Sequence, residues 1–210
     1  MIKKIGITQR VHTIREYQEH RDELDQSWSK FLNEIGILQI ILPNNKDIIT
    51  NRIINNYDLD GVILTGGEIK NKASNNNSGQ INRDEFENNL ISYCIEKKIP
   101  ILGICRGMQM LNLFFGGELI NLKNHSGKSH NIKNLSDSKD LPKRVNSFHD
   151  FGINKEKLPK NLKIIATDDN GAIEAFEDQD KKIFGIMWHP ERNEKFDPID
   201  VKIIKEIFNL

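Results

Sequence analysis

Apolar residues along the chain form short continuous runs, and segments with helical spacing separate these runs. Such runs are typical of strands buried on both faces, and the helical segments between them indicate crossover helices. In the first half of the chain, strands are predicted at residues 3–8, 38–42, 60–67 and 100–104. Helices are predicted at residues 26–36, 46–57 and 84–97, with a further helix after residue 105. Strands alternating with helices predict parallel pairing, with ligands bound at the carboxyl ends of the strands.

The second half of the chain has a more β-like pattern. Strands are predicted at residues 145–148, 162–167, 172–176 and 182–188, and a closing helix at residues 198–208. The predicted fold is a flavodoxin-like three-layer α/β sandwich with a mostly parallel central sheet and added antiparallel strands in the C-terminal half. No internal repeat or linker divides the pattern, so one domain is expected over residues 1–210.

Two polar segments, residues 9–25 and 69–82, are long for connections inside a compact domain. Both are expected to be loops at the carboxyl edge of the sheet. They are interpreted as lids over a site, and for the Asn-rich segment 69–82 disorder is the alternative.

Composition limits the classes of partner. The chain has 30 Lys and Arg against 30 Asp and Glu, so its charge favours neither nucleic acid nor a membrane surface as a partner. Two cysteines cannot build a disulfide framework, which suggests the reducing cytoplasm. The apolar run near the N-terminus is too short for a signal peptide, and no window is long enough to span a membrane.

The candidate chemistry centres on Cys105, which follows a predicted strand and precedes a predicted helix. It stands between Gly103 and Gly107 in the pattern Gly-x-nucleophile-x-Gly, known as a nucleophile elbow. A helix N-terminus favours a thiolate over a thiol. We interpret Cys105 as a nucleophile, and a small buried core cysteine is the alternative. Cys94 lies at helical spacing from Leu90 and is expected in the core.

A cysteine nucleophile needs a base, and His189 near the end of the last predicted strand offers one. In extended backbone, residues two apart point to the same side, and Pro190 keeps this stretch extended. Glu191 can therefore orient the ring of His189. The alternative is a histidine at a strand end capped by a surface carboxylate.

An oxyanion hole needs backbone N–H donors. One is expected from Arg106, directly after the nucleophile, and the other from Gly67 at the end of a predicted strand. Gly66 is the alternative donor and is expected to contact the substrate.

No metal site or organic cofactor is predicted. His125, His130 and His149 share no ligand spacing with a thiolate or carboxylate, so loop histidines are the simpler interpretation.

These residues resemble those of the class I (triad) glutamine amidotransferases. More closely they resemble the γ-glutamyl hydrolase branch, peptidase family C26, which includes the γ-glutamyl-γ-aminobutyrate hydrolases. The likeness is carried by GICRGMQ at 103–109, TGG at 65–67, WHPE at 188–191, RD at 83–84, VNSFH at 145–149 and DNGAIE at 169–174.

The resemblance implies a Cys105–His189–Glu191 triad that cleaves a γ-glutamyl amide through a glutamyl thioester. It also implies that Gln109 and the backbone near Ser147, Phe148 and His149 bind the α-amino and α-carboxylate groups of a small γ-glutamyl substrate. The chain departs from the family where residues 150–151 read Asp-Phe instead of a Gln-containing continuation. One alternative is a glutaminase subunit that delivers ammonia to a separate synthetase. Another is an inactive triad scaffold used only for binding.

The leaving group is a separate question. The loops expected around the site carry cationic and hydrogen-bonding residues, namely Arg10, His12, Lys70, Lys128 and His130. Solvated loop charge is one interpretation. The other is a phosphorylated leaving group, such as a nucleotide, because converging cations bind phosphate strongly. In this respect the chain resembles the γ-glutamyl-CDP-amidate hydrolases of bacterial capsular phosphoramidate synthesis.

Overall fold

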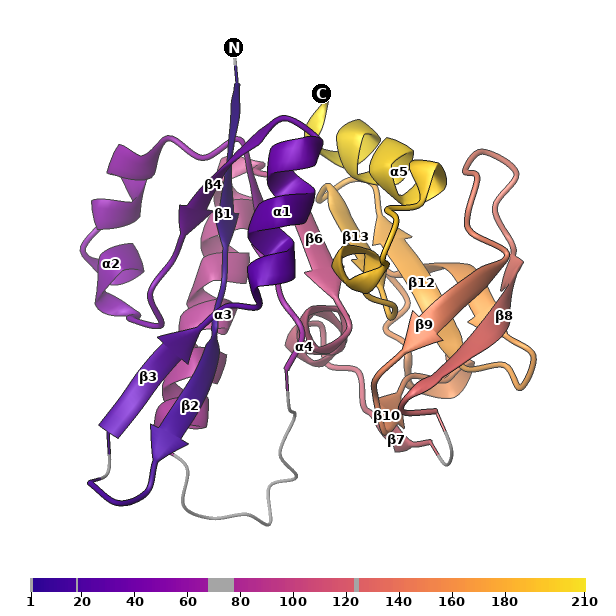
Figure 1. The fold of residues 1–210 in the computed structure, drawn as a ribbon, viewed down its shortest axis with the longest axis horizontal. Coiled ribbons are helices and arrows are strands. Elements are labelled where there is room, and N and C mark those ends of the chain that lie inside the picture. Colours follow the sequence, from indigo (N-terminus) through magenta and orange to yellow (C-terminus); the bar gives the residue numbers. More distant parts are fainter. Residues whose placement is uncertain (1, 18, 68–77, 123–124) are drawn as a thin grey trace.

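The computed structural model describes residues 2–17, 19–67, 78–122 and 125–210, and nine strands of these residues form one mixed sheet (Figure 1). The parallel part contains, in spatial order, β4 (Ile37–Ile41), β1 (Lys3–Ile7), β5 (Gly61–Leu64), β6 (Ile101–Ile104) and β13 (Ile183–Ile186). The antiparallel part continues with β12 (Ile173–Asp178), β11 (Lys163–Asp168), β8 (Lys128–Asn134) and β9 (Arg144–Ser147). The predicted mixed sheet is confirmed.

Helices cover both faces of the sheet, which gives the predicted three-layer sandwich. On one face, Trp28 and Phe31 of α1 share a core cluster with Phe208 of α5. On the other face, Leu90 of α3 and Leu111 of α4 share a second cluster. The helices are α1 (Gln26–Glu34), α2 (Asp47–Thr50), α3 (Ser78–Lys97), α4 (Arg106–Phe114) and α5 (Pro198–Phe208), with 3-10 helices at Ile53–Tyr57, Lys155–Lys157 and Pro190–Arg192.

The pairing of β13 with β6 brings the candidate residues to one edge of the sheet. These strands are parallel, and Ile186 lies opposite Ile104. Cys105 directly follows β6, and His189 follows β13 by three residues. Because carboxyl ends of parallel strands share an edge, the two residues come together although 84 positions in the sequence separate them.

The segment 9–25 is not the loop that its polar composition predicts. It forms a hairpin of β2 (Arg10–Ile14) and β3 (Glu19–Glu23), in which Arg10 pairs with Glu23. The strand β3 is exposed throughout and carries charged residues, so no alternation of apolar residues marked it. A Cβ on Gly79 would lie 2.5 Å from Val11 Cγ1, which shows how closely the hairpin packs on α3.

Other boundaries also differ from the sequence prediction. The helix α3 begins at Ser78 rather than residue 84, because its first turn packs against the hairpin. The helix predicted at 46–57 is broken at Arg52, whose φ of 58° is left-handed. Three further strands were not predicted, namely β7 (Ile120–Asn121), β8 and β10 (Phe151–Gly152). The strands β7 and β10 are only two residues long, and β8 is mostly polar. Residues 69–77 lie outside the described part of the chain, so a lid formed by that segment stays a prediction.

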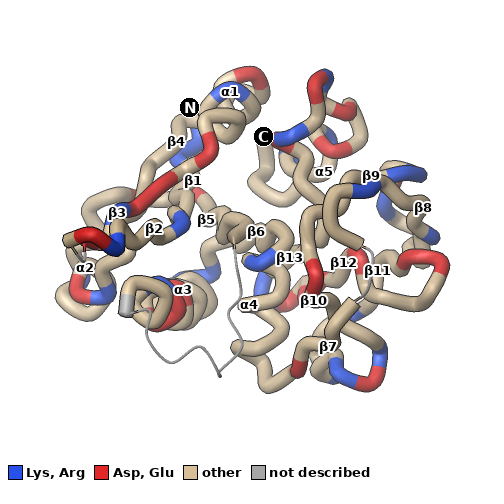
Figure 2. Tube along the Cα trace, turned by 60° about the horizontal axis from the view of Figure 1, so that its bottom comes forward, with Lys and Arg blue, Asp and Glu red and all other residues tan. Residues whose placement is uncertain are grey.

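Charged residues of both signs are interspersed over most elements (Figure 2), in line with the zero net charge. Among the described residues, no helix is both long enough and apolar enough to cross a membrane.

Candidate active site

Cys105 occupies a strained turn between β6 and α4. Its φ of 51° and ψ of −105° fall in a region that L-residues rarely adopt. A Cβ on Gly107 would lie 2.0 Å from the carbonyl oxygen of Leu64, and one on Gly103 would lie 2.7 Å from the backbone of Gly107. Both flanking glycines are therefore required by close backbone approach, which is the geometry of a nucleophile elbow.

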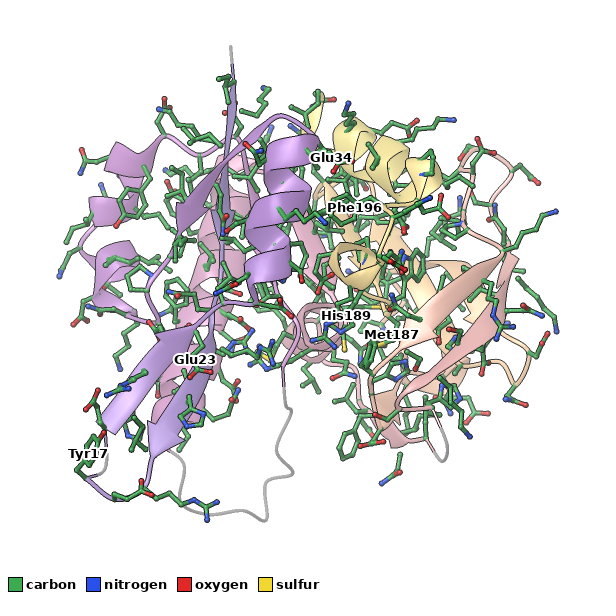
Figure 3. All side chains as sticks on the ribbon, viewed as in Figure 1. Tyr17, Glu23, Glu34, Met187, His189 and Phe196 are labelled. Atoms are coloured by element: carbon green, nitrogen blue, oxygen red, sulfur yellow. The ribbon has the colours of Figure 1, made fainter. Side chains whose placement is uncertain are left out.

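His189 is held by contacts on its ring and on its backbone. Its Nδ1 lies 2.7 Å from Glu191 Oε1, and both side chains are buried. The side chain of Asn146 makes two hydrogen bonds to the backbone of His189. It accepts from the N–H at 2.9 Å and donates to the carbonyl oxygen at 2.8 Å. Burial alone would lower the pKa of His189, but interactions with Cys105 and Glu191 outweigh it and raise this pKa to about 9. In Figure 3, His189 and Met187 lie together between the parallel and antiparallel parts of the sheet.

A buried ionic network, built on Glu87 of α3, lies beneath the elbow. Glu87 Oε1 accepts from Thr8 Oγ1 at 2.9 Å and from Arg83 Nε at 2.9 Å, while Oε2 accepts from Arg106 Nη1. Arg106 also pairs with Asp84. The two arginines outweigh the effect of burial, which alone would raise the pKa of Glu87, and lower this pKa below its usual value. The carboxylate is thus ionised and fully paired.

The network fixes the segment 65–67 next to the elbow. Arg83 Nη2 donates to the carbonyl oxygens of Thr65 at 3.0 Å and Gly66 at 3.2 Å. Because the peptide that follows Gly66 is trans, its N–H, which belongs to Gly67, points away from Arg83. A Cβ on Gly67 would lie 2.5 Å from Arg83 Nη1 and 3.2 Å from Arg10 Cγ, and its φ is 147°, so glycine is required there. The roles of Glu87 and Thr8 were not predicted, because no motif marks them.

A smaller hollow of about 290 Å³ opens beside Cys105. Gln109 Nε2 donates to the carbonyl oxygen of Phe151 at 2.7 Å, and His149 Nδ1 lies 3.0 Å from the same oxygen. Burial, opposed by that contact, lowers the pKa of His149 to about 4, so its ring is neutral near pH 7. Ser147 is buried nearby. The lining residues are Gly67, Cys105, Gln109, Phe148, His149, Asp150 and Phe151.

A larger cleft of about 410 Å³ lies on the other side of Cys105 and His189. Its lining includes the charged residues Arg10, Arg15, Glu23, Arg83 and Arg192, together with His12. Arg83 is paired with buried Glu87, and Arg10 and Arg192 lie 3.8 and 3.9 Å from Asp25, so these charges are balanced in part. The guanidiniums of Arg10 and Arg192 nevertheless line the cleft and are partly exposed. The cation Arg192 was not singled out from the sequence, although it directly follows Glu191. Its guanidinium lies 4.6 Å from the ring centroid of Phe148, and that ring meets His189 edge to face at 5.7 Å.

The predicted leaving-group residues are not all brought together. Arg10 and His12 line the larger cleft. Lys128 is exposed on β8, and His130 contacts Glu174; neither lines the cleft. Lys70 lies outside the described residues. Cys94 is buried as expected, and burial raises the pKa of its thiol.

Comparison with known proteins shows which family the chain is related to. The family model of peptidase C26 matches residues 4–191. A γ-glutamyl-CDP-amidate hydrolase of Campylobacter jejuni is 36% identical over 206 residues, which are 98% of this chain and 98% of that protein. One component of the glutamine-hydrolysing GMP synthase of Methanocaldococcus jannaschii is 29% identical over 76% of this chain and 78% of that protein.

The fold also matches solved structures. A glutamine amidotransferase from Thermotoga maritima superposes with a TM-score of 0.68 at 19% identity, covering 100% of this chain and 85% of that one. A glutamine amidotransferase from Methylobacillus flagellatus gives a TM-score of 0.60 at 18% identity, covering 92% of this chain and 72% of that one. At these identities the likeness concerns the fold. The sequence matches also show the family, and the chain belongs to the peptidase C26 family.

Proposed function

We propose that this chain is a cysteine hydrolase that cleaves γ-glutamyl amide bonds, with Cys105, His189 and Glu191 as its catalytic residues. The observation that carries the proposal is the strained Cys105 in one cleft with His189, whose Nδ1 is held by Glu191 at 2.7 Å. Membership of the peptidase C26 family supports the same chemistry. The free, buried state of both cysteines suits a reducing compartment such as the cytoplasm.

In the proposed reaction, His189 holds the proton that Cys105 gives up. The sulfur attacks the γ-carbonyl carbon, and the N–H groups of Arg106 and Gly67 stabilise the oxyanion. The C–N bond then breaks as His189 passes its proton to the departing nitrogen, which leaves a glutamyl thioester. Water next loses a proton to His189 and attacks the thioester, the C–S bond breaks, and glutamate is released. The pKa of about 9 leaves His189 protonated near neutral pH, so the proton for the leaving group is in place.

Recognition of the glutamyl part is assigned to the smaller hollow. Gln109 and the backbone of residues 147–149 would bind its α-amino and α-carboxylate groups, and Gly66 would also contact the substrate. Gln109 and His149 line this hollow together with Cys105, which supports that assignment.

We infer an anionic, phosphorylated leaving group in the larger cleft. The partly exposed guanidiniums of Arg10 and Arg192 there suit a phosphate or diphosphate better than a neutral amine. The C. jejuni relative named γ-glutamyl-CDP-amidate hydrolase supports a nucleotide form of that group. With such a substrate, the enzyme would act in capsular phosphoramidate synthesis.

The proposal is tested by incubating the purified chain alone with three substrates. These are a γ-glutamyl amide of a neutral amine, a γ-glutamyl phosphoramidate of a nucleotide, and glutamine. We expect glutamate release from the γ-glutamyl compounds without a second protein, with the highest kcat/KM for the nucleotide substrate. Turnover of glutamine alone, stimulated by an added synthetase, would instead support the role of a glutaminase that serves an amidotransferase.

A further inference from the structure

Three residues far apart in the sequence converge behind the smaller hollow. His125 lies between β7 and β8, His149 between β9 and β10, and Glu174 on β12. Each offers one possible metal-ligand atom, and these three atoms all lie within 4.8 Å of one another. We call His125, His149 and Glu174 the histidine cluster. Glu174 is 1% exposed, so its carboxylate must be balanced inside the protein.

Each histidine of the cluster has one ring nitrogen close to an oxygen, and its other nitrogen has no hydrogen-bond partner in the described part of the chain. His149 Nδ1 donates to the carbonyl oxygen of Phe151, because a carbonyl can only accept, and this leaves Nε2 with its lone pair. His125 Nε2 lies 3.4 Å from Asp168 Oδ2. Among the described residues, His149 Nε2 and His125 Nδ1 are buried without a hydrogen-bond partner. Histidines that bind metal ions are held in this way, with the second nitrogen directed at a carbonyl or carboxylate.

Glu174 completes the set with a negative charge. Neither of its oxygens accepts a hydrogen bond from a described residue. His130 Nε2 lies 3.2 Å from Oε1, close enough for an ion-pair contact but without hydrogen-bond alignment. Oε2 has no hydrogen-bond partner in the described part of the chain. A buried carboxylate without donors is costly unless a positive charge compensates it.

We propose that His125, His149 and Glu174 bind a divalent transition-metal ion, with Zn²⁺ as the best match. Two imidazoles and one carboxylate are typical zinc ligands, whereas Mg²⁺ and Ca²⁺ prefer oxygen ligands alone. Ligand atoms around a tetrahedral Zn²⁺ are roughly 3.3 Å apart. The observed spacing therefore needs only small side-chain rotations to close around the ion.

The ion has a positioning role for the glutamyl corner. His149 and Gln109 share the carbonyl oxygen of Phe151 as their acceptor, and Gln109 lines the hollow beside Cys105. An ion that holds His149 therefore also fixes the segment that faces the substrate. Because the ligands come from three segments, the ion would join β12 to the loops before β8 and before β10.

The test uses tag-free protein with Cys105→Ala, so that the candidate nucleophile cannot bind the metal. After treatment with a chelator and dialysis, this protein is titrated with Zn²⁺ by calorimetry, and its thermal midpoint is measured with and without Zn²⁺. We expect one equivalent of Zn²⁺ per chain and a higher midpoint in its presence. Substitution by Co²⁺ should give visible d–d bands without a thiolate charge-transfer band.

Three further variants in the same background decide which residues bind. We expect His125→Ala and Glu174→Gln to abolish both the stoichiometric binding and the zinc-dependent rise of the midpoint. His20→Ala, which removes an exposed histidine from β3, should bind Zn²⁺ like the parent. His125 lies in a loop and is only partly buried, so its variant decides the matter if Glu174→Gln does not fold.

Two results would overturn the site. One is a folded Cys105→Ala protein that takes up no Zn²⁺, which would mean that protonated histidines alone balance Glu174. The other is binding that is unchanged in His125→Ala. Neither result depends on whether the chain hydrolyses γ-glutamyl amides, because neither measurement uses a substrate.

Discussion

Two buried polar groups flank the candidate nucleophile, and they differ in how their charges are balanced. In the network on the parallel side, each oxygen of Glu87 accepts from an arginine, and Thr8 adds a further donor. In the histidine cluster on the antiparallel side, Glu174 faces imidazoles and accepts no hydrogen bond from a described residue. Burial alone does not distinguish a structural ion pair from a proposed ligand site. The two groups differ instead in the number of hydrogen-bond donors that reach the carboxylate.

Cys105 lies between these two groups, so its removal should stop catalysis without disturbing either of them. We expect Cys105→Ala to lower kcat by roughly 10⁴- to 10⁶-fold, the loss typical of removing a member of a catalytic triad. Cys94→Ala, which removes the other buried thiol, should keep kcat near that of the parent. Glutamate release under saturating substrate measures both variants. Equal losses in the two variants would mean that Cys105 is not the nucleophile.

The network around Glu87 should be costly to break on one side. Glu87→Gln leaves Arg83 and Arg106 buried with their main counter-charge gone, so we expect a loss of about 3–5 kcal/mol in the free energy of unfolding. Glu85→Gln is the matched control on the same helix. It removes an exposed pair with Lys46 and should cost under about 1 kcal/mol.

Urea unfolding of both variants provides the comparison. A similar, small loss in the two would mean that the network adds little to stability and does not differ from surface pairs.

A third buried carboxyl, Asp200, sharpens the comparison because only one side chain of the described residues donates a hydrogen bond to it. Trp188 Nε1 donates to its Oδ1 at 2.9 Å. Burial raises the pKa of Asp200 from its ordinary value of 3.8 to about 7, although the contact with Trp188 opposes this. Between these two pKa values, the carboxyl of Asp200 keeps its proton in the folded state and loses it in the unfolded state. The contribution of Asp200 to the free energy of unfolding is therefore fully present below the pKa of the unfolded state. It is lost as the pH rises through the pKa of the folded state.

Asp200→Asn should therefore stabilise the protein at high pH and have little effect at low pH. We expect a gain on the order of 4 kcal/mol in the free energy of unfolding at about pH 8, and almost none below about pH 4. Asn retains an oxygen for Trp188, so the hydrogen bond remains possible. Urea unfolding at both pH values measures the gain, and an equal gain at both would rule out ionisation as its cause.

The sequence allowed the prediction of those features that depend on spacing along the chain. Apolar runs marked the parallel strands, Gly103 and Gly107 marked the elbow, and the two-residue spacing of His189 and Glu191 predicted their contact. These features are local, or they follow from the general rule that parallel strands share an edge.

The remaining features depend on contacts between distant segments. The β2–β3 hairpin carries no apolar alternation, and packing against Gly79 holds it in place. The network joins Thr8 to Glu87, and the histidine cluster joins His125 to Glu174, across 79 and 49 positions. No motif spacing links such pairs, so sequence patterns could not predict them.

The smallest expected effect concerns the leaving group. It tests whether the larger cleft and the smaller hollow beside Cys105 bind different parts of the substrate. We expect Arg10→Ala, in the larger cleft, to raise KM for a phosphorylated γ-glutamyl substrate by about 10-fold and to spare a neutral γ-glutamyl amide. Added salt should reduce the difference. Lys128→Ala removes an exposed cation outside the cleft and is the matched control. Equal shifts for both substrates in Arg10→Ala would contradict an anionic leaving group in this cleft.

The central claim is that Cys105 carries a glutamyl thioester during turnover. The direct measurement is mass spectrometry of protein quenched in acid while it turns over an excess of the γ-glutamyl substrate, with hydroxylamine added in a parallel sample to capture the thioester. We predict an added mass of one glutamyl group on the peptide that contains Cys105, and γ-glutamyl hydroxamate in the parallel sample. A glutamyl group on Cys94, or glutamate release with neither adduct nor hydroxamate, would contradict the account.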